Sequence, residues 1–203
     1  MGDSLGKAPI PGDAPAGASV RYEPEFEQLA AEIGKLESVE QTPVDWRVVE
    51  ELCRTLLSSK GKDLLVSSYF AVACLERRGY AGLHEGLQTV WDMCQTFWED
   101  LQPKKKRARA RGNALDWLKD RALARVESIE QEPSESDREA LSGSLALVKE
   151  LYGFCMDELG DDAPAMGPLR RELQKRVELI PAPQAEPEPA PPPPAPEAAA
   201  AAP

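Results

Sequence analysis

The sequence predicts an all-α protein: a bundle of about seven helices, preceded by an extended N-terminal arm and followed by a disordered Pro/Ala-rich C-terminal tail. Apolar residues recur at the i, i+4, i+7 and i+8 spacing of one helix face, most clearly over residues 82–103. The apolar/polar alternation that is typical of strands does not occur in the sequence. These patterns divide the chain into an arm (1–20), a helical domain (21–180) and a tail (181–203).

The first two helices carry recognisable start signals. The prolines and glycines of the arm disfavour regular structure before residue 20. Pro24 suits the first turn of a helix over 24–36, because a proline there loses no helical hydrogen bond. Thr42-Pro43-Val44-Asp45 resembles a capping box and opens a second helix, which Gly61 ends.

The centre of the bundle is predicted from the next two segments. Residues 63–78 are apolar nearly all round, as in a helix that is buried on several sides, and Gly79 suits its C-terminal end. A fourth helix over 82–103 carries one apolar stripe and is stopped by Pro103. The stripe consists of Leu83, Leu87, Val90, Trp91, Cys94, Phe97, Trp98 and Leu101.

Three further helices follow a basic loop over 104–111. Asn113 is a suitable N-cap for the fifth helix, and Ser134 starts the sixth after Pro133. A short seventh helix covers 168–180. In the sixth helix, apolar residues alternate in steps of four and three, a heptad seam suited to a helix pair or to self-association. The seam consists of Leu141, Leu145, Val148, Tyr152, Cys155 and Leu159.

The composition restricts the class of partner and the compartment. A formal net charge of −11 repels phosphate backbones, so no nucleic-acid partner is expected. Four isolated cysteines among apolar residues are typical of buried thiols in a reducing compartment. The N-terminus has no apolar stretch of the signal-peptide kind, and no stretch reaches the length of about 20 apolar residues that spans a bilayer. We expect a cytoplasmic protein that does not insert into a membrane.

Residues that could support catalysis are scarce. The single histidine, His84, has no cysteine or carboxylate partners at metal-ligand spacing. Phosphate-binding glycine loops and the GxSxG nucleophile motif do not occur, and the carboxylates lie in polar contexts. The sequence therefore predicts no enzyme, with no catalytic, cofactor-binding or metal-binding residues.

A basic run interrupts the acidic chain between the fourth and fifth helices. Three interpretations remain open: a solvated loop, a patch that docks an acidic partner protein, or a contact to an anionic surface or nucleic acid. The run contains no aromatic residue for base stacking, which weakens the third. The run consists of Lys104, Lys105, Lys106, Arg107, Arg109 and Arg111.

Short motifs follow one another in order over about residues 9–125. They are Pro15-Ala16-Gly17, Val20-Arg21-Tyr22, Val44-Asp45-Trp46, Lys62-Asp63-Leu64, Gly79-Tyr80-Ala81-Gly82-Leu83, Phe97-Trp98-Glu99-Asp100-Leu101-Gln102-Pro103 and Arg111-Gly112-Asn113-Ala114-Leu115-Asp116-Trp117-Leu118. On these motifs, the chain resembles the ImpA N-terminal domain of TssA proteins from bacterial type VI secretion systems.

The resemblance implies an assembly role without enzymatic activity, exercised through contacts with baseplate, sheath or tube proteins. The motifs supply Arg21, Tyr22, Lys62 and Asp63 as candidates for partner contact, and we expect Arg21 and Tyr22 to hold the arm on the bundle. The basic run adds Lys104, Lys105, Lys106 and Arg107 as partner-contact candidates. The remaining motif residues are expected in core or cap positions: Trp46, Trp98, Pro103, Asn113 and Trp117.

Overall fold

The computed structural model describes residues 4–38 and 42–181, and the predicted all-α fold is confirmed there. These residues form six α-helices and three single 3-10 turns, with no strand among them. The helices are α1 (Pro24–Gly34), α2 (Trp46–Ser59), α3 (Leu64–Phe97), α4 (Ala108–Glu127), α5 (Arg138–Leu159) and α6 (Gly167–Glu178). The tail predicted over 181–203 lies outside the described residues, apart from Pro181.

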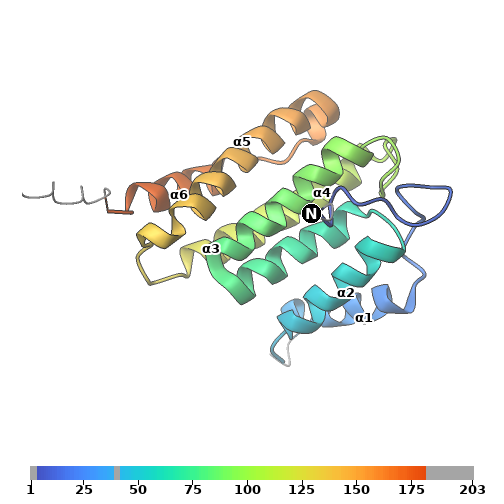
Figure 1. Ribbon diagram of the computed structural model, residues 1–203, viewed down its shortest axis with the longest axis horizontal. Coiled ribbons are helices and arrows are strands. Elements are labelled where there is room, and N and C mark those ends of the chain that lie inside the picture. Colours follow the sequence, from blue (N-terminus) through green and yellow to red (C-terminus); the bar gives the residue numbers. More distant parts are fainter. Residues whose placement is uncertain (1–3, 39–41, 182–203) are drawn as a thin grey trace, which may run out of the picture.

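Helix α3 is a helical hairpin whose two arms, 64–78 and 80–97, run in opposite directions (Figure 1). Gly79 makes the reversal with φ 59° and ψ −138°, a conformation that only glycine adopts without strain. A Cβ at Gly86 would lie 2.4 Å from the Cα of Ala71, so the absence of a side chain lets the two arms touch. The two separate central helices predicted from the sequence correspond to these arms, which makes seven helical rods in all.

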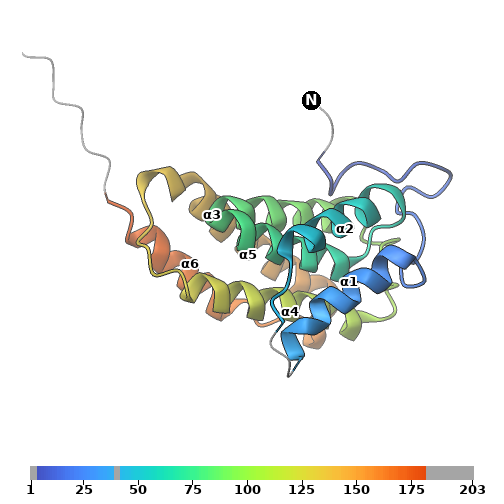
Figure 2. The same cartoon turned by 90° about the horizontal axis from the view of Figure 1, so that it is seen from below.

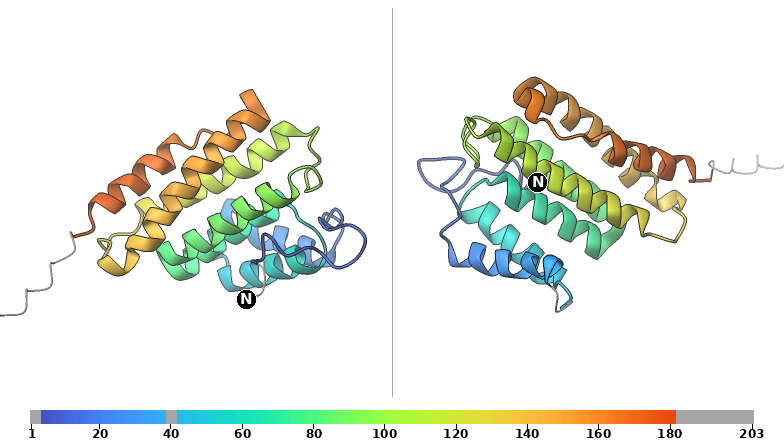
Figure 3. Two further views of the ribbon diagram at one scale, coloured as in Figure 1. Left: turned by 45° about the horizontal axis from the view of Figure 1, so that its top comes forward. Right: turned by 180° about the vertical axis from the view of Figure 1, so that it is seen from behind.

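The rods follow one another across the molecule in nearly sequential order. Figures 1 and 2 show α1 and α2 on one side of the α3 hairpin and α5 with α6 on the other. Helix α3 packs against α2, α4 and α5, so it forms the centre as its apolar sequence predicts. The N-terminal arm crosses the end of the molecule where the α3–α4 connection also lies (Figure 3).

Three helix boundaries differ from the sequence prediction. Helix α2 is capped by Asp45, whose Oδ1 accepts from the backbone N–H groups of Arg47 and Val48, so Thr42 does not open it. The second arm of α3 ends at Phe97, and Pro103 follows only after a turn. Helix α4 begins at Ala108, so Asn113 is an exposed residue inside that helix and not its N-cap.

The heptad seam predicted for self-association is occupied within the chain. Its residues are buried against α3 and α6, except Tyr152, which is 39% exposed. A seam that is already packed cannot also pair with a second copy unless the bundle opens. Ser134 does start this helix as predicted, through a capping box with Asp137 that leads by one 3-10 turn into α5.

Candidate partner-docking site

The base of the α3 hairpin is tied to the N-terminal arm by Asp63. Its Oδ1 accepts from the backbone N–H groups of Leu65 (2.9 Å) and Val66 (3.3 Å), which makes it the N-cap of α3. The Arg21 Nε lies 3.3 Å from the other carboxylate oxygen and brings the arm to this end. Burial raises the pKa of Asp63, and the charge of Arg21 together with the two backbone donors opposes that rise. Arg21 thus holds the arm as expected.

Lys62 is a fully buried cation at the same junction. Its Nζ donates to the carbonyl oxygens of Leu57 (2.7 Å) and Leu5 (2.9 Å), so one ammonium joins α2 to the arm. The Nζ also lies 5.5 Å from the centroid of the Phe97 ring. Burial lowers the pKa of Lys62 to about 8. Lys62 and Asp63 are both 0% exposed, so these two candidates for partner contact are structural ties in the folded chain.

Backbone hydrogen bonds close the hairpin at this base. The Lys62 carbonyl accepts from the N–H of Gln102 (2.8 Å), and the N–H of Leu64 donates to the carbonyl of Gln102 (2.7 Å). The N–H of Lys62 donates to the carbonyl of Ala16 (2.8 Å) in the arm. The arm, the start of α3 and the segment after its end therefore meet as one backbone network.

Arg111 organises the connection between α3 and α4. Its Nε donates to the Pro103 carbonyl (2.7 Å), one Nη donates to the Leu101 carbonyl (3.0 Å), and its guanidinium lies 4.2 Å from the Trp98 ring centroid. The side chain is 0% exposed. The sequence analysis placed Arg111 at the end of a basic loop over 104–111; the structure instead places it inside α4, with its side chain buried against that connection.

A pocket of about 380 Å³ opens where these parts converge. It brings together residues from the arm, the hairpin base, the α3–α4 connection and the first turns of α4, among them Arg21, Asp63, Pro103 and Arg107. Four of the residues singled out in the sequence therefore share one pocket. Tyr22, the residue after Arg21, is 95% exposed, so it does not hold the arm as expected.

The remaining candidates include the motif tryptophans and the basic run, of which Arg107 lines the pocket. Trp98 is 6% exposed and its Nε1 donates to Glu158 of α5 (2.6 Å), while Trp117 packs edge-on against Tyr69 with ring centroids 4.6 Å apart. Trp46 is half-buried against the core. Lys105 forms an ion pair with Glu158 at 3.2 Å, whereas Lys104, Lys106, Arg107 and Arg109 are exposed without an ion pair among the described residues.

The sequence analysis missed one buried charge cluster. Glu50 of α2 is 3% exposed and forms ion pairs with Arg77 (2.5 Å), Arg78 (2.8 Å) and Arg54 (3.0 Å). Burial favours a higher pKa for Glu50, but hydrogen bonds from the three guanidinium groups outweigh it and lower the pKa. The sequence feature that could have predicted this cluster is the position of Glu50, next to Val49 on the apolar face of α2 and four residues before Arg54. This cluster joins α2 to the turn of the α3 hairpin.

The described residues offer little for catalysis. No group of three or more His, Cys, Asp or Glu side chains among them could hold a metal ion. Burial raises the pKa of all four thiols, to about 12 for Cys74 and Cys155, which keeps them protonated. Across residues 4–38 and 42–181, no helix is long and apolar enough to cross a bilayer. The described residues form a helical domain with a pocket lined mainly by polar and charged side chains.

A comparison with known families shows which family this helical domain belongs to. Residues 7–120, more than half of the chain, match the family described as "ImpA, N-terminal, type VI secretion system". The chain therefore belongs to the ImpA N-terminal family, as its motifs predicted. No curated protein matches the sequence.

A solved structure has a similar fold. It is the N-terminal domain, including the conserved ImpA_N region, of the TssA component of the type VI secretion system from Burkholderia cenocepacia. The match has a TM-score of 0.70 at 16% sequence identity and covers 86% of this chain and 90% of that one. At this identity the likeness concerns the fold. At 86% of the chain, it covers more than the residues 7–120 of the family match.

Proposed function

We propose that this chain is a non-enzymatic assembly subunit of a bacterial type VI secretion system that binds baseplate, sheath or tube proteins. The observation that carries the proposal is membership of the ImpA N-terminal family over residues 7–120. We further propose that it works in the cytoplasm, which the four free, buried thiols support.

We assign the partner contact to the surface around the 380 Å³ pocket. Tyr22 is a large aromatic side chain on a backbone fixed by its neighbour Arg21, so little conformational entropy is lost when a partner covers it. Arg107 lines the pocket and has no ion pair among the described residues, which leaves its guanidinium available for a carboxylate. These two residues supply an aromatic anchor and a charge.

Affinity purification of the tagged chain from its own host, followed by mass spectrometry, tests the proposal. We expect baseplate, sheath or tube subunits to be enriched, and the double variant Tyr22→Ala/Arg107→Ala to lose that enrichment and to secrete less tube protein. Arg47→Ala removes an exposed arginine on α2 that does not line the pocket, and serves as the control. If no secretion-system subunit is recovered while the host assembles sheaths, the proposed role is wrong.

A second candidate function is binding of an anionic surface or nucleic acid by the basic run. The observation that favours it is the exposure of Lys104, Lys106, Arg107 and Arg109 without ion pairs among the described residues. Binding of an oligonucleotide that weakens steeply with salt, and is abolished by Lys104→Gln/Lys106→Gln, would favour this function. The net charge of −11 of the whole chain, basic run included, argues against it.

A further inference from the structure

Apart from Arg121, whose guanidinium lies 5.9 Å from the Trp117 ring centroid, the unpaired cations on the described surface fall into two groups. Most lysines and arginines form an ion pair with a carboxylate, as Arg138 does with Glu135. One group without such a pair is the basic run discussed above. The other lies on α5 and α6, where Lys149, Arg170 and Arg171 have no carboxylate within ion-pair distance among the described residues.

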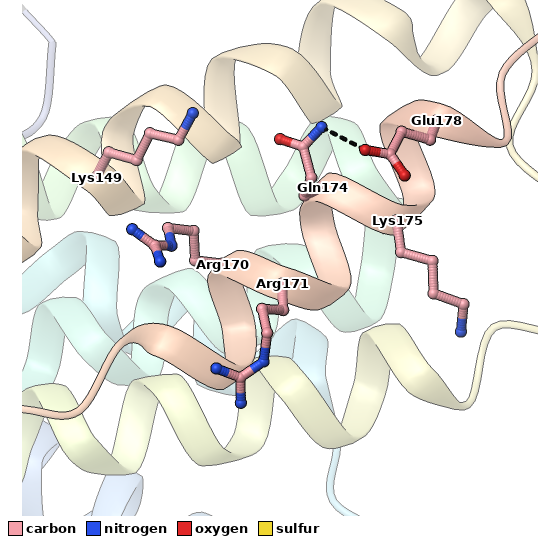
Figure 4. A pocket seen from close by; sticks show the side chains of 6 residues that line it. All are labelled: Lys149, Arg170, Arg171, Gln174, Lys175 and Glu178. Carbon is pink, nitrogen blue, oxygen red and sulfur yellow. Dashed lines mark hydrogen bonds between the residues drawn. The ribbon is translucent and has the colours of Figure 1, made fainter.

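These three cations face a shallow groove of about 360 Å³ between α5 and α6 (Figure 4). The acidic groups at its edge are already engaged: Glu178 accepts from the Gln174 amide (2.8 Å), and Glu172 binds the buried Arg176 (2.8 Å). The groove therefore presents a net positive surface on a chain of net charge −11. The lining residues are Lys149, Arg170, Arg171, Gln174, Lys175 and Glu178.

An exposed apolar strip continues from the groove. Tyr152 and Met156, one and two turns after Lys149 on α5, are 39% and 47% exposed. A second pocket of about 260 Å³ lies beside Tyr152 and Pro168, and Arg170 lines both pockets. Cations next to an exposed aromatic ring and a methionine form a surface that combines charge with adaptable apolar contact.

We propose that the α5–α6 groove binds an acidic segment of a partner protein, with carboxylates at Lys149, Arg170 and Arg171 and an apolar side chain against Tyr152. The occupant is acidic because Lys149, Arg170 and Arg171 lack acidic partners within the described chain, whereas Lys175 is paired with Glu172. It is a protein segment and not a nucleic acid, because so few cations within an acidic molecule cannot offset repulsion of a phosphate backbone. This groove is built from residues beyond 120, outside the family match and distinct from the surface around Tyr22.

Fluorescence anisotropy with the full chain tests the proposal independently of any secretion assay. The probe is a labelled synthetic peptide with a run of glutamates around one central phenylalanine. We expect Arg170→Glu/Arg171→Glu to weaken its binding by about tenfold or more, because two attractions become repulsions. The matched control Lys104→Glu/Lys106→Glu makes the same charge change at the other unpaired group and is expected to leave the affinity within about twofold.

Further measurements separate the alternatives. Tyr152→Ser is expected to weaken the phenylalanine peptide but not an all-glutamate peptide, and circular dichroism verifies that each variant is folded. The proposal is overturned if the peptide does not bind at millimolar concentration, or if the control variant loses as much affinity as the groove variant. It is equally overturned if a single-stranded oligonucleotide of the same charge binds more tightly through Arg170 and Arg171.

Discussion

Replacing Lys62 with methionine tests the buried ammonium at the hairpin base. Methionine keeps the length of the side chain but donates no hydrogen bond, so the carbonyl oxygens of Leu5 and Leu57 lose their partner. Each unpaired buried acceptor costs about 1–3 kcal/mol. The variant also removes the cost of burying a charge, which offsets much of that loss near neutral pH.

The test depends on how the difference in free energy of unfolding between the wild type and Lys62→Met changes with pH. The pKa of Lys62 falls from 10.5 in the unfolded chain to about 8 in the folded one. Between these values the unfolded chain binds more protons, so the Lys62 contribution to the free energy of unfolding rises with pH, by about 1.4 kcal/mol per unit. Folded Lys62 is half-protonated at pH 8 and the unfolded group begins to lose its proton by pH 10. From pH 8 to pH 10 the wild type should therefore gain roughly 2 kcal/mol relative to Lys62→Met.

Urea unfolding of both proteins at several pH values between 7 and 10 measures this difference directly. Subtracting one free energy of unfolding from the other also cancels the effect of the four buried thiols. Their raised pKa values lower stability above pH 9 in both proteins alike. Lys60→Met is the control: Lys60 pairs with Glu23, its pKa is raised, and its contribution should stay flat up to pH 10. A wild-type advantage over Lys62→Met that is constant or shrinks with pH would refute the buried-charge account.

Three further predictions concern stability and are measured by urea or thermal unfolding. Asp45→Ala should lower the free energy of unfolding by about 1 kcal/mol through loss of the α2 cap, whereas Asn113→Ala should leave it unchanged because that residue lies within α4. Equal losses of stability in the two variants would show that Asn113 does act as a cap. Gly82→Ala should destabilise the protein strongly, because the new Cβ would lie 1.9 Å from the Cys74 carbonyl oxygen. Its control, Gly153→Ala, meets no atom within 4 Å and should stabilise α5 by up to about 1 kcal/mol. A tolerated Gly82→Ala would contradict the close contact between the two arms of α3. Arg111→Leu should cost about 2–5 kcal/mol by leaving two carbonyl oxygens unpaired, and a near-neutral effect would contradict its role in the α3–α4 connection.

The local pattern of the sequence determined the helical rods and which face of each is buried. The stripe over 82–103 predicted burial for Leu83, Val90 and Trp98, and all three are at most 6% exposed. Ser134 and Pro24 marked helix starts correctly, because capping and the fixed φ of proline depend only on residues within one turn. The family was also accessible from the sequence, since the order of short motifs is a linear property.

Contacts between distant segments determined where α4 begins and which cations are buried. Asn113 has a cap signal, yet α4 starts at Ala108, where alanine and arginine favour helix and Arg111 gains partners in the preceding connection. Lys62 and Arg111 look like surface cations in sequence, and only the tertiary structure supplies the carbonyl oxygens and rings that make their burial tolerable.

For the candidate sites too, the sequence supplied the residues and the tertiary structure decided how they are arranged. Sequence motifs supplied Arg21 and Asp63, and the basic run supplied Arg107, but only the fold places the three around one pocket. Only the structure shows that the missing side chains of Gly82 and Gly86 let the two arms of α3 touch. The sequence by itself determined the helices, their apolar faces and the family, because these depend on neighbouring residues. Which charges are buried, paired or left free depended on packing between distant segments, and only the tertiary structure decided it.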